Sequence, residues 1–338
     1  MYQEAEALSK ITDASETASV RKEFVRPGQT LPLVILGCRV VPATAWPREN
    51  RAMIEERLNE YGAVLFRGFP IDSAESFHAF ANAAAGELLE YKERSSPRHE
   101  QGDRVYTSTD YPPEYRIYLH NEHSYACRFP MKLLFCCLTP ARQGGQTPLA
   151  DTRKIMAGIS AETRRRFAEK KWMYVRNFGA GFGLSWQTAF QTSSAAEVET
   201  YCMRAGIECE WKVDGGLRTR QIRPAMFHHP RTGEQVWFNH ATFFHLSTLP
   251  PTISAMLQSS FREEDLPNNT YYGDGSPIEP ETLEELRRAY EAETFSFDWQ
   301  RGDVLLVDNM LVAHGRESYQ GERRVLVAMA ESYEPPDS

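Results

Sequence analysis

Apolar residues along most of this chain form short runs separated by proline, glycine and asparagine. Runs of this length and spacing, rich in β-branched and aromatic residues, predict strands and are typical of an all-β sandwich or barrel. The predicted strands after Lys92 span 117–126, 133–138, 172–178, 235–245, 303–314 and 323–330. We therefore expect a mainly β fold, a double-stranded β-helix or jelly roll.

Helical periodicity appears on both sides of this β pattern. In the N-terminal part, strands predicted at 32–36 and 64–69 alternate with helices at 50–61 and 71–85. Asp72 or Ser73 supplies an N-cap for the second of these helices. Further helices are expected at 160–170, 195–205 and 280–292, as insertions packed on the β core.

Length and composition indicate how these elements are organised. The chain has 338 residues, of which 41% are hydrophobic, enough for one sizeable core. It contains no internal repeat and no low-complexity segment. We expect a loose N-terminal segment over residues 1–25 and a single jelly-roll domain over 26–338, with an α/β edge at its N-terminal end and helical insertions.

Charge and hydropathy exclude several classes of protein. The net charge is −8 and no run of five like charges occurs, which argues against nucleic acid as a partner. The longest apolar stretch, 31–41, is too short to span a bilayer. From the polar start of the chain we expect no secretory signal, and its six cysteines form no CxxC pair. We expect a cytoplasmic protein that takes a small-molecule substrate, and the sequence leaves a homo-oligomer open.

A first candidate for chemistry is the pair His120 and Glu122 in LHNEH. Two residues apart on an extended strand, both side chains point to one face and can approach the same cation. This composition gives about one such histidine–acid pair by chance, so the pair alone is a weak signal.

The C-terminal block over 302–330 strengthens the case for a metal site at His120 and Glu122. The pattern reads as a strand, an Asp308-Asn309 turn, a second strand that ends at His314, and a third that opens with Arg323 and Arg324. If the third strand pairs antiparallel with the second, one of these arginines lies beside His314. Strand alternation alone does not decide which. One carboxylate and two imidazoles on one face of a cation form the facial triad of non-haem Fe(II) oxygenases, and a nearby guanidinium can bind the carboxylate of a 2-oxo acid.

These motifs carry a family resemblance. His120-x-Glu122, then GGQTPLAD (144–151), then DNMLVAHGR followed by the arginine pair, resemble the Fe(II)/2-oxoglutarate dioxygenases of the taurine dioxygenase type, TauD/TfdA. The likeness covers nearly the whole chain and is greatest to the SyrP-like hydroxylases of peptide-antibiotic gene clusters. It implies His120, Glu122 and His314 as iron ligands, Arg324 as the clamp on 2-oxoglutarate, and Thr147 as a second hydrogen-bond donor there.

The resemblance also implies a reaction. Fe(II), 2-oxoglutarate and O2 would hydroxylate an unactivated C–H bond, with release of succinate and CO2. The substrate would be an amino acid or an amino-acid derivative, free or presented by a carrier protein. Taurine-using relatives carry an arginine four positions after the clamp, where this chain has Ala328, and halogenating relatives lack the ligand carboxylate that Glu122 supplies.

Alternatives remain open from the sequence. The same cofactors could desaturate, epoxidise or cyclise a free small acid. A different class is a non-catalytic jelly roll that holds a structural metal. Arg324 and Thr147 argue against this class, because a structural metal site needs no anion clamp.

Other candidates have structural interpretations. We expect His123 to support the ligands, His228 and His229 to lie on an exposed hairpin tip, and 266–280 to form a lid or a plain surface loop.

Overall fold

The computed structural model describes residues 20–37, 42–90, 100–102, 104–107, 111–179 and 183–336. Most of the segment predicted to be loose, 1–19, lies outside the described residues. Residues 20–24 were included in that segment, but they form strand β1 because Val20–Phe24 pairs antiparallel with Leu33–Gly37.

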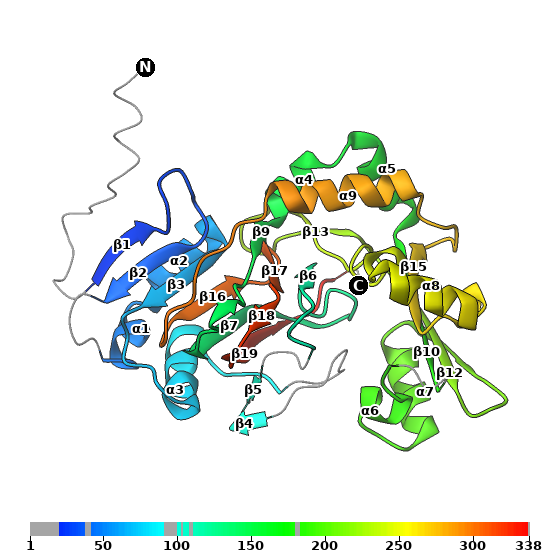
Figure 1. The fold of residues 1–338 in the computed structure, drawn as a ribbon, viewed down its shortest axis with the longest axis horizontal. Helices are drawn as coiled ribbons and strands as arrows, with labels where there is room; N and C mark the ends of the chain where they lie inside the picture. Colours follow the sequence, from blue (N-terminus) through cyan, green and yellow to red (C-terminus); the bar gives the residue numbers. More distant parts are fainter. Residues whose placement is uncertain are drawn as a thin grey trace.

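The largest sheet has eight strands in the order β1-β2-β3-β16-β7-β19-β5-β4 (Figure 1). All neighbours are antiparallel except β2 and β3. The bounds of its strands are β1 Val20–Phe24, β2 Leu33–Gly37, β3 Ala63–Arg67, β4 Glu100–Gly102, β5 Val105–Thr107, β7 Phe129–Thr139, β16 Val304–Asp308 and β19 Arg324–Tyr333.

A three-stranded antiparallel sheet, β6-β17-β9, forms the second layer. Its strands are β6 Ile117–His120, β9 Leu149–Asp151 and β17 Val312–Arg316. Leu149 and Val312 from this sheet share one buried cluster with Leu133 and Val325 from the large sheet. The core between two facing sheets is that of a jelly roll, as predicted.

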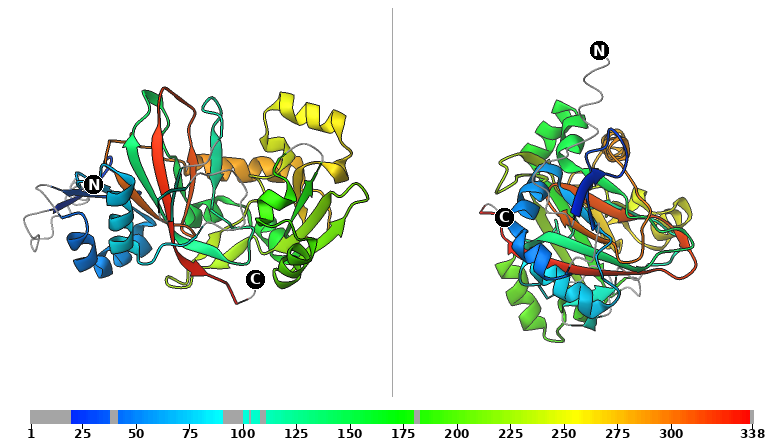
Figure 2. Two further views of the ribbon diagram at one scale, coloured as in Figure 1. Left: turned by 90° about the horizontal axis from the view of Figure 1, so that it is seen from below. Right: turned by 90° about the vertical axis from the view of Figure 1, so that its left-hand side faces the viewer.

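Helices cover the outer face of the large sheet. They are α1 Ala45–Glu49, α2 Arg51–Tyr61 and α3 Ala74–Ala85 (Figure 2). Alternate residues of β19, Leu326 and Ala328, pack against Phe77 and Phe80 of α3. The helix begins with a capping box in which Ser73 is the N-cap, one of the two candidates from the sequence.

At the other end of the molecule from these helices lies a lobe built on the sheet β11-β12-β10-β15 (Figure 2). Its strands are β10 Trp172–Phe178, β11 Ile207–Trp211, β12 Leu217–Arg223 and β15 Asn268–Tyr272. The remaining helices are α4 Thr152–Gly158, α5 Ala161–Lys170, α6 Trp186–Phe190, α7 Ala195–Arg204, α8 Pro251–Ser260 and α9 Pro280–Ala292, with short helices at Leu246–Thr248 and Glu263–Asp265. Short strand pairs join β13 Met226–His228 with β14 Gln235–Trp237 and β8 Gln143–Gly144 with β18 Tyr319–Gln320.

The lobe corrects one expectation. Residues 268–272, predicted as part of a lid or surface loop, form β15 and pair along β10. Asn269 and Thr270 are buried there, so this part of the segment is fixed in the sheet. Across the described part of the chain, no helix combines the length and apolar character needed to cross a membrane.

Candidate metal centre

His120 and His314 face each other across two paired strands. His120 is the last residue of β6, and the register of β6 with β17 places it directly opposite His314. Their rings lie 4.5 Å apart, centroid to centroid. One ligand atom each from His120, Glu122 and His314 can be chosen so that all three lie within 4.8 Å of one another. The structure therefore brings together the three residues predicted from the sequence.

The route by which Glu122 reaches this group differs from the prediction. The strand predicted over 117–126 ends at His120, and Glu122 lies in the turn that follows. His123 adopts a left-handed backbone conformation with φ 56°, and its Nε2 lies 3.5 Å from Oε1 of Glu122. Its ring thus lies beside the carboxylate, next to a ligand residue as expected.

A backbone contact favours one tautomer of the His120 ring. Nδ1 of His120 lies 2.8 Å from the carbonyl oxygen of Tyr118, an acceptor that favours a proton on Nδ1. Nε2 is then left as the basic nitrogen that can bind a cation.

Asn309 holds the turn that carries Glu122. Its Oδ1 accepts a hydrogen bond from the backbone N–H of Glu122 at 2.8 Å, and its Nδ2 donates to the carbonyl oxygens of Glu122 and Pro130, each at 2.8 Å. Asn309 itself belongs to the turn between β16 and β17. A residue of the turn that leads into the strand of His314 thus also fixes the backbone of Glu122.

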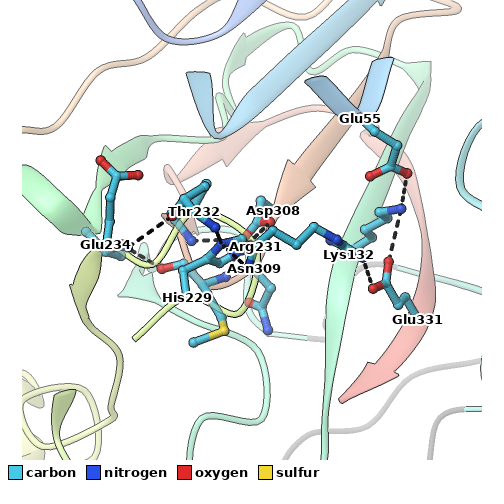
Figure 3. A network of polar contacts seen from close by, with 12 residues as sticks. Glu55, Lys132, His229, Arg231, Thr232, Glu234, Asp308, Asn309 and Glu331 are labelled. Carbon is cyan, nitrogen blue, oxygen red and sulfur yellow. Dashed lines mark hydrogen bonds and ion pairs between the residues drawn. The ribbon is translucent and has the colours of Figure 1, made fainter. Parts of the chain in front are cut away.

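The same turn is anchored by a buried pair of residues, Asp308 and His229 (Figure 3). Oδ2 of Asp308 lies 3.0 Å from Nε2 of His229, while Oδ1 accepts from the backbone N–H groups of Met310 and Leu311. The expectation that His229 lies on an exposed hairpin tip is wrong, since the fold packs this side chain under the turn. His228 is exposed, as expected.

On one side of the two histidines lies a small cavity of about 40 Å³. Thr147 lines it, is 3% exposed, and accepts a hydrogen bond from Nε1 of Trp299 at 3.2 Å. With an oxygen lone pair engaged by Trp299, the hydroxyl proton of Thr147 is available to an acceptor in the cavity. Arg316 and Arg323 complete its charged lining.

Arg324, which the family resemblance implies as the clamp, does not line this cavity. Arg323, Val325 and Val327 line the cavity, whereas Arg324 is exposed on the opposite face of β19, where its charge acts on Glu75 of α3. Side chains of a strand alternate between faces, so only one member of the arginine pair can face His314.

Arg323 is positioned in the small cavity so that its guanidinium can bind an anion. Its Nε donates to the carbonyl oxygen of Gly145 at 2.9 Å. Burial, together with the like charge of Arg316, lowers the pKa of Arg323 to about 10, so an anion that binds between the two guanidinium groups would be stabilised by both. Gly145 has φ 74°, and a Cβ there would lie 3.0 Å from Cδ of Arg323, so glycine is required beside the guanidinium.

A larger cavity of about 290 Å³ opens on the other side of the triad. His120 and Glu122 belong to its lining, and its walls are largely aromatic, with Tyr111, Tyr115, Tyr118, Tyr125, Phe243 and Phe244. His240 is fully buried in this wall, and burial holds its pKa well below the usual range, so it is neutral. The triad therefore lies between a small cationic cavity and a larger aromatic one.

Comparison with known proteins places this geometry in a family. Residues 36–329 match the family model of the taurine catabolism dioxygenases, TauD/TfdA. The chain belongs to the TauD/TfdA family. It is 42% identical over 282 residues to the dapdiamide synthesis protein DdaC of Enterobacter agglomerans, a match that covers 83% of this chain and 86% of that protein.

Solved structures with low sequence identity to this chain share the fold. PvcB of Pseudomonas aeruginosa, an Fe, α-ketoglutarate-dependent oxygenase from an isonitrile synthetic pathway, superposes with a TM-score of 0.52 at 16% identity, over 93% of this chain and 92% of that one. An asparagine oxygenase in complex with Fe(II), 3-hydroxyasparagine and succinate gives a TM-score of 0.53 at 14% identity, over 85% and 79%. The present TauD/TfdA chain is an Fe(II)- and 2-oxoglutarate-dependent dioxygenase that uses O2, as the sequence predicted.

The residues of the candidate centre fit this cofactor. Two imidazoles and one carboxylate are the donor set of the non-haem Fe(II) facial triad. The larger cavity is lined by His120 and Glu122, so it would give a substrate access to a metal held by these residues. Bound Fe(II) supplies O2 activation coupled to oxidative decarboxylation of 2-oxoglutarate.

Proposed function

We propose that His120, Glu122 and His314 hold Fe(II), and that Arg323 and Thr147 bind the distal carboxylate of 2-oxoglutarate. The observation that carries this proposal is the shared cavity: the two histidines, Thr147 and Arg323 all line the same small space. A guanidinium that has lost its hydration by burial gains most from a carboxylate partner. Arg323 thus replaces Arg324 in the role that the family resemblance gave to the second arginine.

The chain's own residues divide the work of the site. Asn309 and Tyr118 orient two of the ligands, and Trp299 directs the hydroxyl of Thr147. The aromatic walls of the larger cavity exclude water from the substrate and leave one side open to the metal ligands. The cosubstrate enters the cationic cavity and the substrate enters the aromatic one.

For the substrate, we propose an amino acid or an amino-acid derivative whose unactivated C–H bond is hydroxylated. In support, the relative DdaC acts in dapdiamide synthesis and the asparagine oxygenase complex contains a hydroxylated amino acid. Arg116 lines both the 290 Å³ cavity and a neighbouring cavity of about 340 Å³, where it can bind a substrate carboxylate. We further propose that a carrier protein presents this substrate to the enzyme.

The cofactor assignment is tested by anaerobic titration of the metal-free protein with Fe(II) and then 2-oxoglutarate. Chelation of the metal by the 2-oxo acid gives a charge-transfer band, which we expect in the wild type and not in His314→Ala. The two adjacent arginines provide a matched pair of variants. Arg323→Ala should weaken 2-oxoglutarate binding by roughly 100-fold or more, as expected when a buried charge pair is broken, and Arg324→Ala should leave it unchanged. Weaker 2-oxoglutarate binding in Arg324→Ala and unchanged binding in Arg323→Ala would assign the clamp to Arg324.

The substrate assignment is tested by mass spectrometry of free and carrier-loaded amino acids after turnover. Gain of one oxygen atom with stoichiometric succinate supports hydroxylation. Loss of two hydrogen atoms identifies desaturation, and turnover of free acids alone removes the carrier from the proposal.

A further inference from the structure

The backbone and the side chains of the loop Tyr111–Arg116 make different contacts, since the backbone carbonyls contact Arg316 and the side chains line the larger cavity. The guanidinium of Arg316 donates through Nη1 to the carbonyl oxygen of Tyr111 at 2.9 Å. Its Nη2 donates to the carbonyl oxygens of Pro112 and Tyr115, each at 2.8 Å. One side chain thus holds three successive parts of this loop by their backbone.

The strand that follows adds a fourth contact. The backbone N–H of Tyr319 donates to the carbonyl oxygen of Pro113 at 2.9 Å. The side chains of Tyr111 and Tyr115 line the larger, aromatic cavity. The loop is therefore a wall of the substrate cavity whose backbone rests on Arg316 and Tyr319.

Arg316 also belongs to the small cationic cavity. It is 5% exposed, and its buried Nε has no hydrogen-bond partner among the residues that the structure describes. Both guanidiniums contact the ring of Tyr319, whose centroid lies 5.2 Å from Cζ of Arg316 and 5.6 Å from Cζ of Arg323. Because the buried Nε of Arg316 needs an acceptor and the guanidinium of Arg323 lies nearby, this part of the cavity suits an anion, or a water molecule that bridges to an anion.

We propose that Arg316 is a positioning residue that couples occupancy of the cosubstrate cavity to the order of the substrate wall 111–116. The inference rests on the proposed function, since it takes 2-oxoglutarate as the anion. Its carboxylate satisfies the leftover Nε, directly or through water, and relieves the repulsion between Arg316 and Arg323. The guanidinium then holds the three carbonyls more firmly, so the cosubstrate prepares the wall that receives the substrate.

Hydrogen exchange of the loop measures this coupling without turnover. Mn(II) replaces Fe(II), and the exchange of the amides in segment 111–119 is followed before and after addition of 2-oxoglutarate. In the wild type we expect this exchange to slow several-fold when the cosubstrate binds. In Arg316→Lys, which keeps the charge but not the fork of donors, exchange should be faster from the start and change little on binding.

Arg51→Lys is the matched control, because Arg51 also donates to backbone carbonyls, those of Asn82 and Ala83, between α2 and α3. It should leave the response of 111–119 intact. Cosubstrate binding to the wild type without slower exchange in 111–119 overturns the coupling and leaves the proposed function standing. If 2-oxoglutarate does not bind the wild type at all, both the proposed function and the coupling fail. The wild-type comparison stands even if the variant does not fold.

Discussion

At the scale of single residues, the site depends on the proposed metal-binding residues and also on the side chains that hold those residues in place. Asn309 is fully buried and uses both ends of its amide on the backbone around Glu122. Truncation would leave a backbone N–H and two carbonyl oxygens without these partners in a dry interior. Each buried polar group left in this way costs about 1–3 kcal/mol.

Asn309→Ala should therefore weaken metal binding by roughly 10–100-fold, the usual effect of losing a group that orients a ligand, and should lower the melting temperature. Anaerobic titration with Fe(II) and thermal unfolding check both effects. Asn50→Ala is the control, since the Asn50 side chain also donates to a backbone carbonyl, that of Trp46, but far from the ligands in sequence and on the helical layer. Metal affinity equal to that of the wild type in Asn309→Ala would refute the orienting role.

His245 provides a pH-dependent prediction. Burial and the charge of Arg287 lower its pKa from 6.5 to about 4, and its Nδ1 accepts a hydrogen bond from the backbone N–H of Ser247. The unfolded chain takes up this proton near pH 6.5, whereas the folded chain resists it until about pH 4. The contribution to stability is thus complete above about pH 6.5 and is lost as the pH falls towards 4.

In His245→Asn the amide oxygen can still accept from Ser247 but does not titrate. We expect its free energy of unfolding, measured by urea denaturation from pH 7 to pH 4.5, to fall less than that of the wild type. His228→Asn, a change at an exposed histidine, should follow the wild-type curve. Parallel curves for wild type and His245→Asn would count against the assignment.

The arginine pair shows where residue-level inference from the sequence ends. Motif spacing together with the family resemblance was enough to predict His120, Glu122, His314 and Thr147 in one place. The choice between Arg323 and Arg324 depends on which face of β19 looks inward, and the irregular register next to Arg324 is visible only in three dimensions. His229 was misjudged for a similar reason, because a turn sequence does not reveal what packs over it.

At the scale of elements, the pairing of β6 with β17 sets the distance between the two histidines. Gly315, between His314 and Arg316, lies at the irregularity in this pairing. A Cβ at this position would lie 2.6 Å from the carbonyl oxygen of Ile117 and 3.2 Å from Cγ of Pro148. Glycine is needed here because the neighbouring backbone approaches too closely for any side chain.

Gly315→Ala should push β6 away from β17, destabilise the protein by about 1–3 kcal/mol, and weaken metal binding in addition. Urea denaturation and metal titration on the same preparation measure the two effects. Gly158→Ala provides the comparison, since a Cβ there would meet only Cβ of Ala289 at 3.7 Å, an ordinary contact. A stable Gly315→Ala protein with wild-type metal affinity would show that the strands can adjust.

Elements with strong periodicity were predicted well from the sequence. The strand 172–178 and the helix 280–292 have the predicted bounds. The strands predicted over 117–126 and 235–245 are much shorter in the structure, Ile117–His120 and Gln235–Trp237. Their apolar and aromatic residues continue past the strand ends because turns in this region line the aromatic cavity, and burial rather than strand pairing determines their composition.

At the scale of the whole molecule, the candidate centre joins parts of the fold that are otherwise held by packing. His120 and His314 belong to the three-stranded sheet, and Glu122 follows in a turn tied to Asn309, which continues from β16 of the large sheet. A metal bound by all three would stabilise both layers together, because the unfolded chain cannot present these ligands at once.

Metal binding should accordingly raise the thermal stability of the native protein and not of a protein lacking one ligand. At a free metal concentration of 100 times the dissociation constant, binding stabilises the folded state by about 2.7 kcal/mol, which corresponds to an increase of several degrees in melting temperature for a chain of this size. Thermal unfolding of the metal-free protein with Mn(II), under exclusion of O2, measures the shift, and a chelator should reverse it. In His314→Ala the shift should vanish, whereas in His228→Ala it should persist, because His228 is exposed and lies outside the candidate centre. An undiminished shift in His314→Ala would place the stabilising metal elsewhere in the molecule and remove the thermodynamic basis for a centre that spans the two sheets.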